Sequence, residues 1–122
     1  MSIKIKRVYE SPANSDGFRI LVDRLWPRGL TKSEAKINLW LKEIAPSNEL
    51  RKWFNHDSEK WLVFNKKYQK ELESKFELIG MVNQLEKENG AISLLYSAKN
   101  EKNNNAVALK MIISSLRNTA II

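Results

Sequence analysis

Two arginines flank an indole and a proline in the segment Arg-Leu-Trp-Pro-Arg-Gly, residues 24–29. A guanidinium group binds phosphate or carboxylate through two parallel N–H donors. The proline stiffens the chain, and the glycine lets the backbone approach a ligand closely. We interpret this segment as one wall of an anion-binding cleft, with charge from Arg24 and Arg28 and a stacking surface from Trp26. The alternative is that the arginines pair with nearby carboxylates and the indole lies in the core.

A second polar segment, residues 97–105, reads Ser-Ala-Lys-Asn-Glu-Lys-Asn-Asn-Asn and precedes an amphipathic pattern. Lys99 adds positive charge there, and the first backbone N–H groups of a helix attract anions. Asn104 and Asn105 are candidates to hydrogen-bond a ligand, although asparagine at this position also favours a helix N-cap. Together the two segments predict a cleft for a small anionic ligand, such as a nucleotide or another phosphorylated metabolite.

Three residues are candidates for acid–base chemistry near this cleft: His56, Tyr96 and Asp23. His56 is the only histidine in the chain, and no nucleophile paired with a base is visible in the sequence. A hydrolase or transferase acting on a phosphorylated substrate is therefore an alternative to simple binding, and whether the protein is an enzyme stays open. With one histidine and no cysteine we expect no transition-metal site, and we expect no cofactor.

The chain has 122 residues and a net charge of +7. The basic excess lies in residues 1–45 and 91–122, on either side of a neutral middle. Such an excess attracts anionic partners, so a nucleic-acid-binding module is a further alternative. No apolar run approaches the ~20 residues that cross a bilayer, and the N-terminus lacks the apolar region of a signal peptide. We therefore expect a cytoplasmic protein with no membrane partner, whose oligomeric state stays open.

The hydrophobic pattern predicts alternating strands and helices. Strands are expected at residues 4–9 and 18–22, and a strand buried on both faces at 91–96. Apolar residues at three- and four-residue steps predict a helix over 57–89, kinked or ended at Gly80, and a last helix over 104–117.

Shorter elements are expected between the second strand and the long helix. The spacing from Thr31 to Glu34 is that of a capping box, so a helical turn is expected there. Residues 37–42 alternate as a short strand or an extended arm, and Ser47 is a suitable N-cap for a short helix.

These elements predict the α/β class: one compact domain, residues 1–122, with a small, mainly parallel sheet flanked by helices. The connection between the first two strands is short, so a hairpin is possible there, and the strand order stays open. Ligands of open α/β sheets bind beyond the carboxyl ends of the strands. Both cleft segments follow strands, which is why we expect them to converge.

The chain resembles the YeaO-like branch of the DUF488 proteins, whose members are largely uncharacterised. The resemblance spans nearly the whole chain and rests on residues 22–29, 41–47, 50–54 with 56–57, and 94–99 followed by 104–107. It implies a compact α/β domain in which the Asp-Arg loop and the Tyr-Ser-Ala-Lys loop converge. It also implies Arg24, Trp26, Pro27, Arg28, Tyr96 and Lys99 as cleft positions, with Trp53 and His56 as possible walls. The Cys-His-Arg box of the wider family is missing here, so thiol chemistry is not expected.

Overall fold

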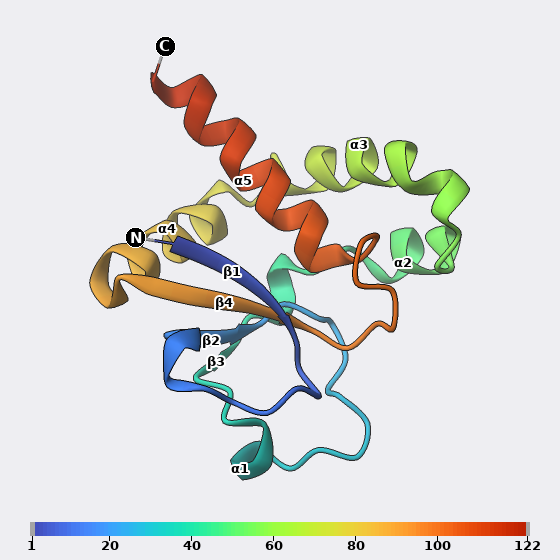
Figure 1. Cartoon of the computed structure of the whole chain (residues 1–122). Helices are drawn as coiled ribbons and strands as arrows, with labels where there is room; N and C mark the ends of the chain where they lie inside the picture. The colour runs from blue at the N-terminus through green and yellow to red at the C-terminus, as the bar shows by residue number, and fades with distance from the viewer. Residues whose placement is uncertain (1, 122) are drawn as a thin grey trace.

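The computed structural model describes the backbone of residues 2–121 and the side chains of residues 2–117. Its centre is a four-stranded sheet in the order β1-β4-β2-β3, in which every pairing is parallel. The strands are β1 (Ser2–Arg7), β2 (Phe18–Leu21), β3 (Leu39–Trp40) and β4 (Ala91–Tyr96). The α/β class and the parallel sheet are therefore confirmed (Figure 1).

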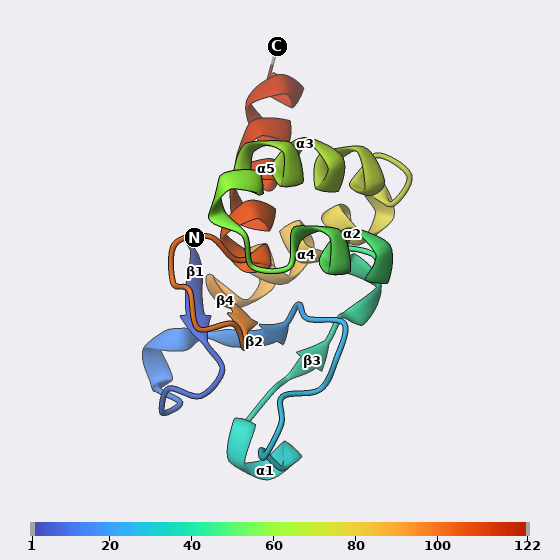
Figure 2. The same ribbon diagram turned by 90° about the vertical axis from the view of Figure 1, so that its right-hand side faces the viewer.

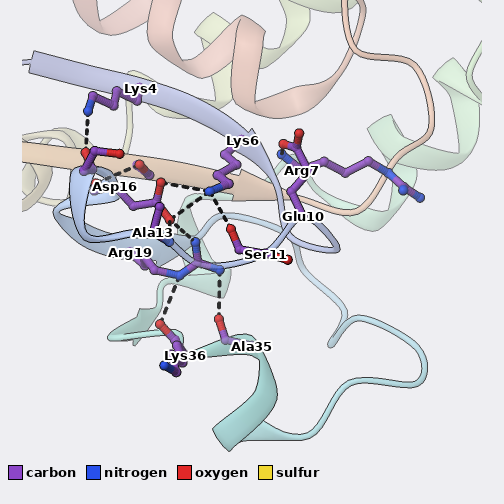
Figure 3. A network of polar contacts seen from close by, with 12 residues as sticks. Lys4, Lys6, Arg7, Glu10, Ser11, Ala13, Asp16, Arg19, Ala35 and Lys36 are labelled. Atoms are coloured by element: carbon purple, nitrogen blue, oxygen red, sulfur yellow. Dashed lines mark hydrogen bonds and ion pairs between the residues drawn. The ribbon is translucent and has the colours of Figure 1, made fainter.

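The first two strands do not form the hairpin that the short connection between them allowed, because β4 lies between β1 and β2 and pairs with both. A polar network holds the returning chain beside the sheet (Figure 3). Lys6 on β1 donates a hydrogen bond to the Ser11 carbonyl at 2.7 Å and forms an ion pair with Asp16 at 3.0 Å. Arg19 on β2 reaches the same Asp16 carboxylate at 2.6 Å. The connection between β1 and β2 is therefore a short polar segment and not an α-helical crossover.

Strand β4 is central, as expected for a strand that is apolar on both faces. Ile92 and Leu94 are fully buried against the helices, and Leu95 is fully buried on the opposite face. The register pairs Leu94 with both Ile5 and Ile20, so one apolar layer crosses three strands. This layer anchors the helices that carry the far side of the site.

Four helices cover one face of the sheet, and α1 (Lys32–Ala35) lies on the other side (Figures 1 and 2). The first group comprises α2 (Asn48–Phe54), α3 (Trp61–Leu72), α4 (Phe76–Asn89) and α5 (Asn105–Ile121). They share one hydrophobic core with the sheet, in which Tyr68 is fully buried and donates to the Ile44 carbonyl at 2.7 Å. The smaller cluster on the second face includes Leu21 and Leu95, covered by Trp26 and Trp40.

The helix expected over residues 57–89 is two helices, preceded by a short 3₁₀ turn (Ser58–Lys60). The break lies at residues 73–75, and Gly80 is an ordinary position inside α4. Lys75 closes the turn by donating its backbone N–H to the Leu72 carbonyl at 2.9 Å. Leu72 and Ile79 are both buried in the same core, so the apolar pattern runs through the break without a change of period.

The expected helix starts after Thr31 and Ser47 are confirmed. The Thr31 hydroxyl accepts from the backbone of Glu34 at 3.2 Å, and the Ser47 hydroxyl accepts from that of Leu50 at 3.1 Å. The last helix begins at Asn105, one residue later than expected. The predicted short strand within residues 37–42 is the two-residue β3, and the two other early strands differ from expectation only at their ends.

Candidate functional site

A cavity of about 950 Å³ lies at the carboxyl ends of the parallel strands. We call it the strand-end cavity. Its wall combines the end of β1, the loop after β2, α2 with the residues that follow it, and the segment from β4 into α5. The two segments that the sequence analysis expected to converge therefore do so. The candidate residues in its lining are Asp23, Arg24, Trp26, Arg28, His56, Lys99, Asn104 and Asn105.

Tyr96 is the one candidate that is outside this lining. It is 3% exposed and belongs to the main hydrophobic core. Burial raises the pKa of its phenol, and the nearby charges of Glu101 and Glu10 raise it further. Trp53, expected as a possible wall, also lies outside the lining, where the ammonium groups of Lys60 and Lys67 sit over its ring.

The carboxylate of Asp23 joins the two converging segments. It accepts hydrogen bonds from the backbone N–H of Ser97 at 2.9 Å and from the Ser97 hydroxyl at 2.7 Å. It also accepts from Nδ2 of Asn105 at 2.9 Å. Burial raises the pKa of Asp23, and these donors together with the charge of Arg51 oppose part of that rise. Asp23 therefore acts first as the clamp between β2, β4 and α5.

Arg24 is fixed by two backbone carbonyls rather than by a carboxylate. Its Nε donates to the Pro46 carbonyl and its Nη2 donates to the Ala45 carbonyl, each at 3.1 Å. Carbonyl oxygens orient the guanidinium without removing its charge. Nη1 makes no hydrogen bond to the described part of the chain. Arg24 therefore brings a positioned positive charge to the cavity wall.

The cavity is also lined by two arginines that the sequence analysis did not single out, Arg7 and Arg51. The Nε of Arg7 donates to the Ala98 carbonyl at 3.0 Å, and its guanidinium lies 4.7 Å from the centre of the Tyr9 ring. Arg51 extends from α2 and donates to the Asn48 side chain at 3.3 Å. Arg7 lies inside the strand that the sequence predicted over residues 4–9, whereas β1 ends at Arg7, and Arg51 lies inside one of the family-like segments.

The charge balance of the wall is strongly positive. Five cationic side chains line the cavity, from Arg7, Arg24, Arg28, Arg51 and Lys99, beside the single carboxylate of Asp23. The ion pairs found within the described residues are Lys6–Asp16, Arg19–Asp16 and Arg117–Glu86. The cationic groups of the wall thus stay unpaired by carboxylates in the described structure, and their field favours an anion.

The aromatic side of the wall is held rigidly. The indole N–H of Trp26 donates to the Leu30 carbonyl at 2.7 Å, and its ring meets that of Trp40 edge-on, with 5.4 Å between the ring centres. The indole N–H of Trp40 in turn donates to the Asp23 carbonyl at 2.8 Å. Phe54 and Phe64, whose ring centres are 4.4 Å apart, also line the cavity. An apolar or aromatic ligand part would find a preformed surface here.

The start of α5 offers less to a ligand than the sequence analysis expected. Asn104 is 2% exposed, and its side-chain oxygen accepts from the Val107 backbone N–H at 2.9 Å, which makes it the N-cap. Its amide nitrogen donates to the Asn100 carbonyl at 3.0 Å. Asn105 is likewise engaged, with the Val22 carbonyl and Asp23. The side-chain amide of Asn104 and the amide nitrogen of Asn105 therefore serve the fold.

His56 lines the cavity from the turn after α2. It is exposed and has a left-handed backbone, with φ of 57°. Its side chain makes no hydrogen bond within the described residues. No group of three or more His, Cys, Asp or Glu side chains placed to hold a metal ion is found in the described part of the chain. No helix there is long and apolar enough to cross a membrane.

Comparison with known proteins decides the family. A family model described as the inactive DUF488-N3 subclade matches residues 2–120. The chain belongs to this subclade. The resemblance to DUF488 that the sequence motifs carried is thereby confirmed.

Two individual proteins are also similar to this chain. The uncharacterized protein YeaO of Escherichia coli K12 is 42% identical over 116 residues, which cover 95% of this chain and all of that protein. The uncharacterized protein Rv3073c of Mycobacterium tuberculosis is 44% identical over 70 residues, which cover 57% of this chain and 59% of that protein. No solved structure matches the chain significantly.

Proposed function

We propose that this protein binds a small anionic ligand, carrying a phosphate or carboxylate group, in the strand-end cavity. One observation carries the proposal: five cationic side chains from four parts of the chain meet around a single carboxylate, and none of the five takes part in an ion pair within the described residues. Bringing like charges together raises the free energy of the folded chain. A bound anion relieves that repulsion.

The arrangement favours binding over catalysis. Asp23, the acid in the cavity wall, already accepts three hydrogen bonds that hold the fold together. His56 has no side-chain partner among the described residues that would orient it as a base. The description of the subclade as inactive supports the same choice. A hydrolase or transferase on a phosphorylated substrate is the alternative function.

The test uses calorimetric titration with inorganic phosphate and with ribose 5-phosphate at physiological salt. The informative variants are Arg28→Gln and Lys99→Gln, because both side chains are exposed, line the cavity and make no hydrogen bond within the described structure. Losing one charged hydrogen bond costs about 1.5–3 kcal/mol, so each variant is expected to weaken binding about tenfold or more.

Lys66→Gln is the matched control, since it removes the same charge from an exposed position of α3 outside the cavity. It is expected to leave the affinity unchanged. If neither probe binds, or if the control weakens binding as much as the cavity variants do, the proposed function is wrong.

A further inference from the structure

We infer that the ligand of the strand-end cavity is a free nucleotide: an organic phosphate that also carries sugar hydroxyls and a planar base. The inference rests on the proposed function, because it adds a sugar and a base to the anion already assigned to the cavity. Three kinds of chemistry meet in the wall and have to be matched by one ligand. They are cationic side chains, a carboxylate with spare acceptor capacity, and an aromatic and apolar surface.

Asp23 supplies the argument for hydroxyl groups. A carboxylate has about four acceptor sites on its two oxygens. Ser97 donates twice to Oδ2, and Asn105 donates once to Oδ1. One acceptor site therefore remains on Oδ1, in a residue that lines the cavity and lies next to Arg24. A ligand that is only an anion would be repelled there, whereas a sugar hydroxyl donates to the remaining site.

Trp26 and its neighbour Leu25 supply the argument for a base. The indole N–H of Trp26 already donates to the Leu30 carbonyl, so the half-buried ring that lines the cavity is what Trp26 offers to a ligand. Leu25 is 58% exposed and lines the same cavity. The contact with Trp40 and the bond from Trp40 to the Asp23 backbone fix the ring close to the clamp. A planar base covers such a surface by stacking.

The size of the cavity points to a free nucleotide rather than a bare ion or a nucleic-acid duplex. Its volume of about 950 Å³ lies within the range of small-molecule sites, roughly 300–1,000 Å³. Inorganic phosphate would leave the wall around Trp26 and Phe54 uncovered. A duplex does not fit into a pocket of this volume.

The experiment compares four probes by calorimetric titration of the full chain: adenosine 5′-monophosphate, ribose 5-phosphate, adenosine, and a short single strand with a 5′-phosphate. Stacking of one base is worth a factor of about five or more in affinity. We therefore expect adenosine 5′-monophosphate to bind at least about fivefold more tightly than ribose 5-phosphate, and adenosine to bind more weakly than either.

Two variants locate the base. Trp26→Leu is expected to abolish the preference for adenosine 5′-monophosphate while leaving the affinity for ribose 5-phosphate unchanged. Trp53→Leu is the matched control, because Trp53 lies outside the cavity lining. If Trp26→Leu does not fold, Leu25→Ala takes its place, because Leu25 is exposed and its replacement removes little buried surface. It is expected to reduce the same preference.

The outcomes separate the two proposals. A preference for adenosine 5′-monophosphate that is lost in Trp26→Leu or Leu25→Ala and kept in Trp53→Leu supports the inference. Equal affinity for the nucleotide and for ribose 5-phosphate overturns the inference and leaves the proposed function standing. Binding of the phosphorylated strand tenfold more tightly than adenosine 5′-monophosphate has the same consequence. Absence of binding by every phosphate probe overturns both.

Discussion

Asp23 and Ser97 form a two-pronged hydrogen bond in which one carboxylate oxygen accepts both the backbone N–H and the hydroxyl of Ser97, at 2.9 and 2.7 Å. The pair joins the end of β2 to the end of β4 across 74 residues of sequence. The second carboxylate oxygen accepts from Asn105 at the start of α5. The geometry of the cavity wall therefore depends on the same residue that supplies its negative charge.

Replacement of Asp23 by Asn is expected to destabilise the fold by about 1–3 kcal/mol at neutral pH. The asparagine oxygen can still accept from Ser97, but its NH₂ group then faces the NH₂ group of Asn105. Asn105 keeps only its hydrogen bond to the Val22 carbonyl, and the new NH₂ group finds no acceptor on Nδ2. Urea unfolding followed by circular dichroism measures the loss. Asp57→Asn is the control, because Asp57 accepts a single backbone hydrogen bond, from Glu59, that asparagine keeps. A loss no larger than the control's would contradict the clamp.

The helix starts at Thr31 and Ser47 and the buried strand 91–96 were predictable because their signals are local. A capping side chain needs only residues three positions away, and a strand buried on both faces is apolar throughout. The segment at residues 73–75 lacks such a signal. The spacing of apolar residues in α3 continues unchanged through this segment into α4. The sequence pattern therefore does not reveal that one helix ends and another begins there.

The candidate site divides in the same way. Arg24, Arg28 and Lys99 lie in the loops that follow β2 and β4, so knowing that ligands bind at strand ends was enough to select them. Arg7 and Arg51 needed the strand order and the packing of α2, which depend on contacts distant in sequence. The engagement of Asn105 with Asp23 was equally out of reach, because it joins residues 82 positions apart.

The pKa of Asp16 is shifted in the opposite direction to the pKa of Asp23, so the two carboxyl groups affect the stability of the fold in opposite ways as pH falls. Burial alone raises the pKa of Asp16, but the Ala13 backbone N–H, Lys6 and Arg19 outweigh it and leave the pKa below its ordinary value of 3.8. A depressed pKa stabilises the folded chain at pH above 3.8, and this contribution is lost as pH falls through the folded-state pKa. The raised pKa of Asp23 stabilises the fold only under acid conditions, and that contribution is lost as pH rises through its folded-state pKa.

Asp16→Asn is accordingly expected to cost about 3–5 kcal/mol at neutral pH, since Arg19 is 4% exposed and loses its counter-charge. The gap between the variant and the unmodified chain should narrow as pH falls below 3.8. Urea unfolding over a pH series checks both statements, with Glu73→Gln as an exposed control. A gap that stays constant down to strongly acidic pH would contradict the role of the ionised carboxylate.

Gly17 and Gly80 form a matched pair for substitution by alanine. Gly17 has φ of 68°, and a Cβ there would lie 2.2 Å from the Ala91 carbonyl oxygen, a backbone atom of the central strand. Gly17→Ala is expected to cost about 3 kcal/mol or more, because a strained backbone adds to the clash. Gly80 lies inside α4 with open space around it, so Gly80→Ala should stabilise the fold by about 0.8–1 kcal/mol. Thermal unfolding of the two variants should shift in opposite directions, and shifts in the same direction would refute the assignment.

Arg24→Lys separates the charge of the cavity wall from its geometry. Lysine keeps the positive charge, but a single ammonium group cannot reproduce the fork that spans the Ala45 and Pro46 carbonyls, each 3.1 Å from a guanidinium nitrogen. We expect a loss of stability of about 1–2 kcal/mol by urea unfolding, because one hydrogen bond from a charged donor to the carbonyl of a buried residue is lost. Arg28→Lys is the control, since the Arg28 side chain is exposed and makes no hydrogen bond within the described residues, so its stability should stay within about 0.5 kcal/mol of the unmodified chain. Equal losses in the two variants would mean that the two carbonyls do not fix Arg24, and the positioned charge at the base of the proposed anion site would have to come from the other arginines.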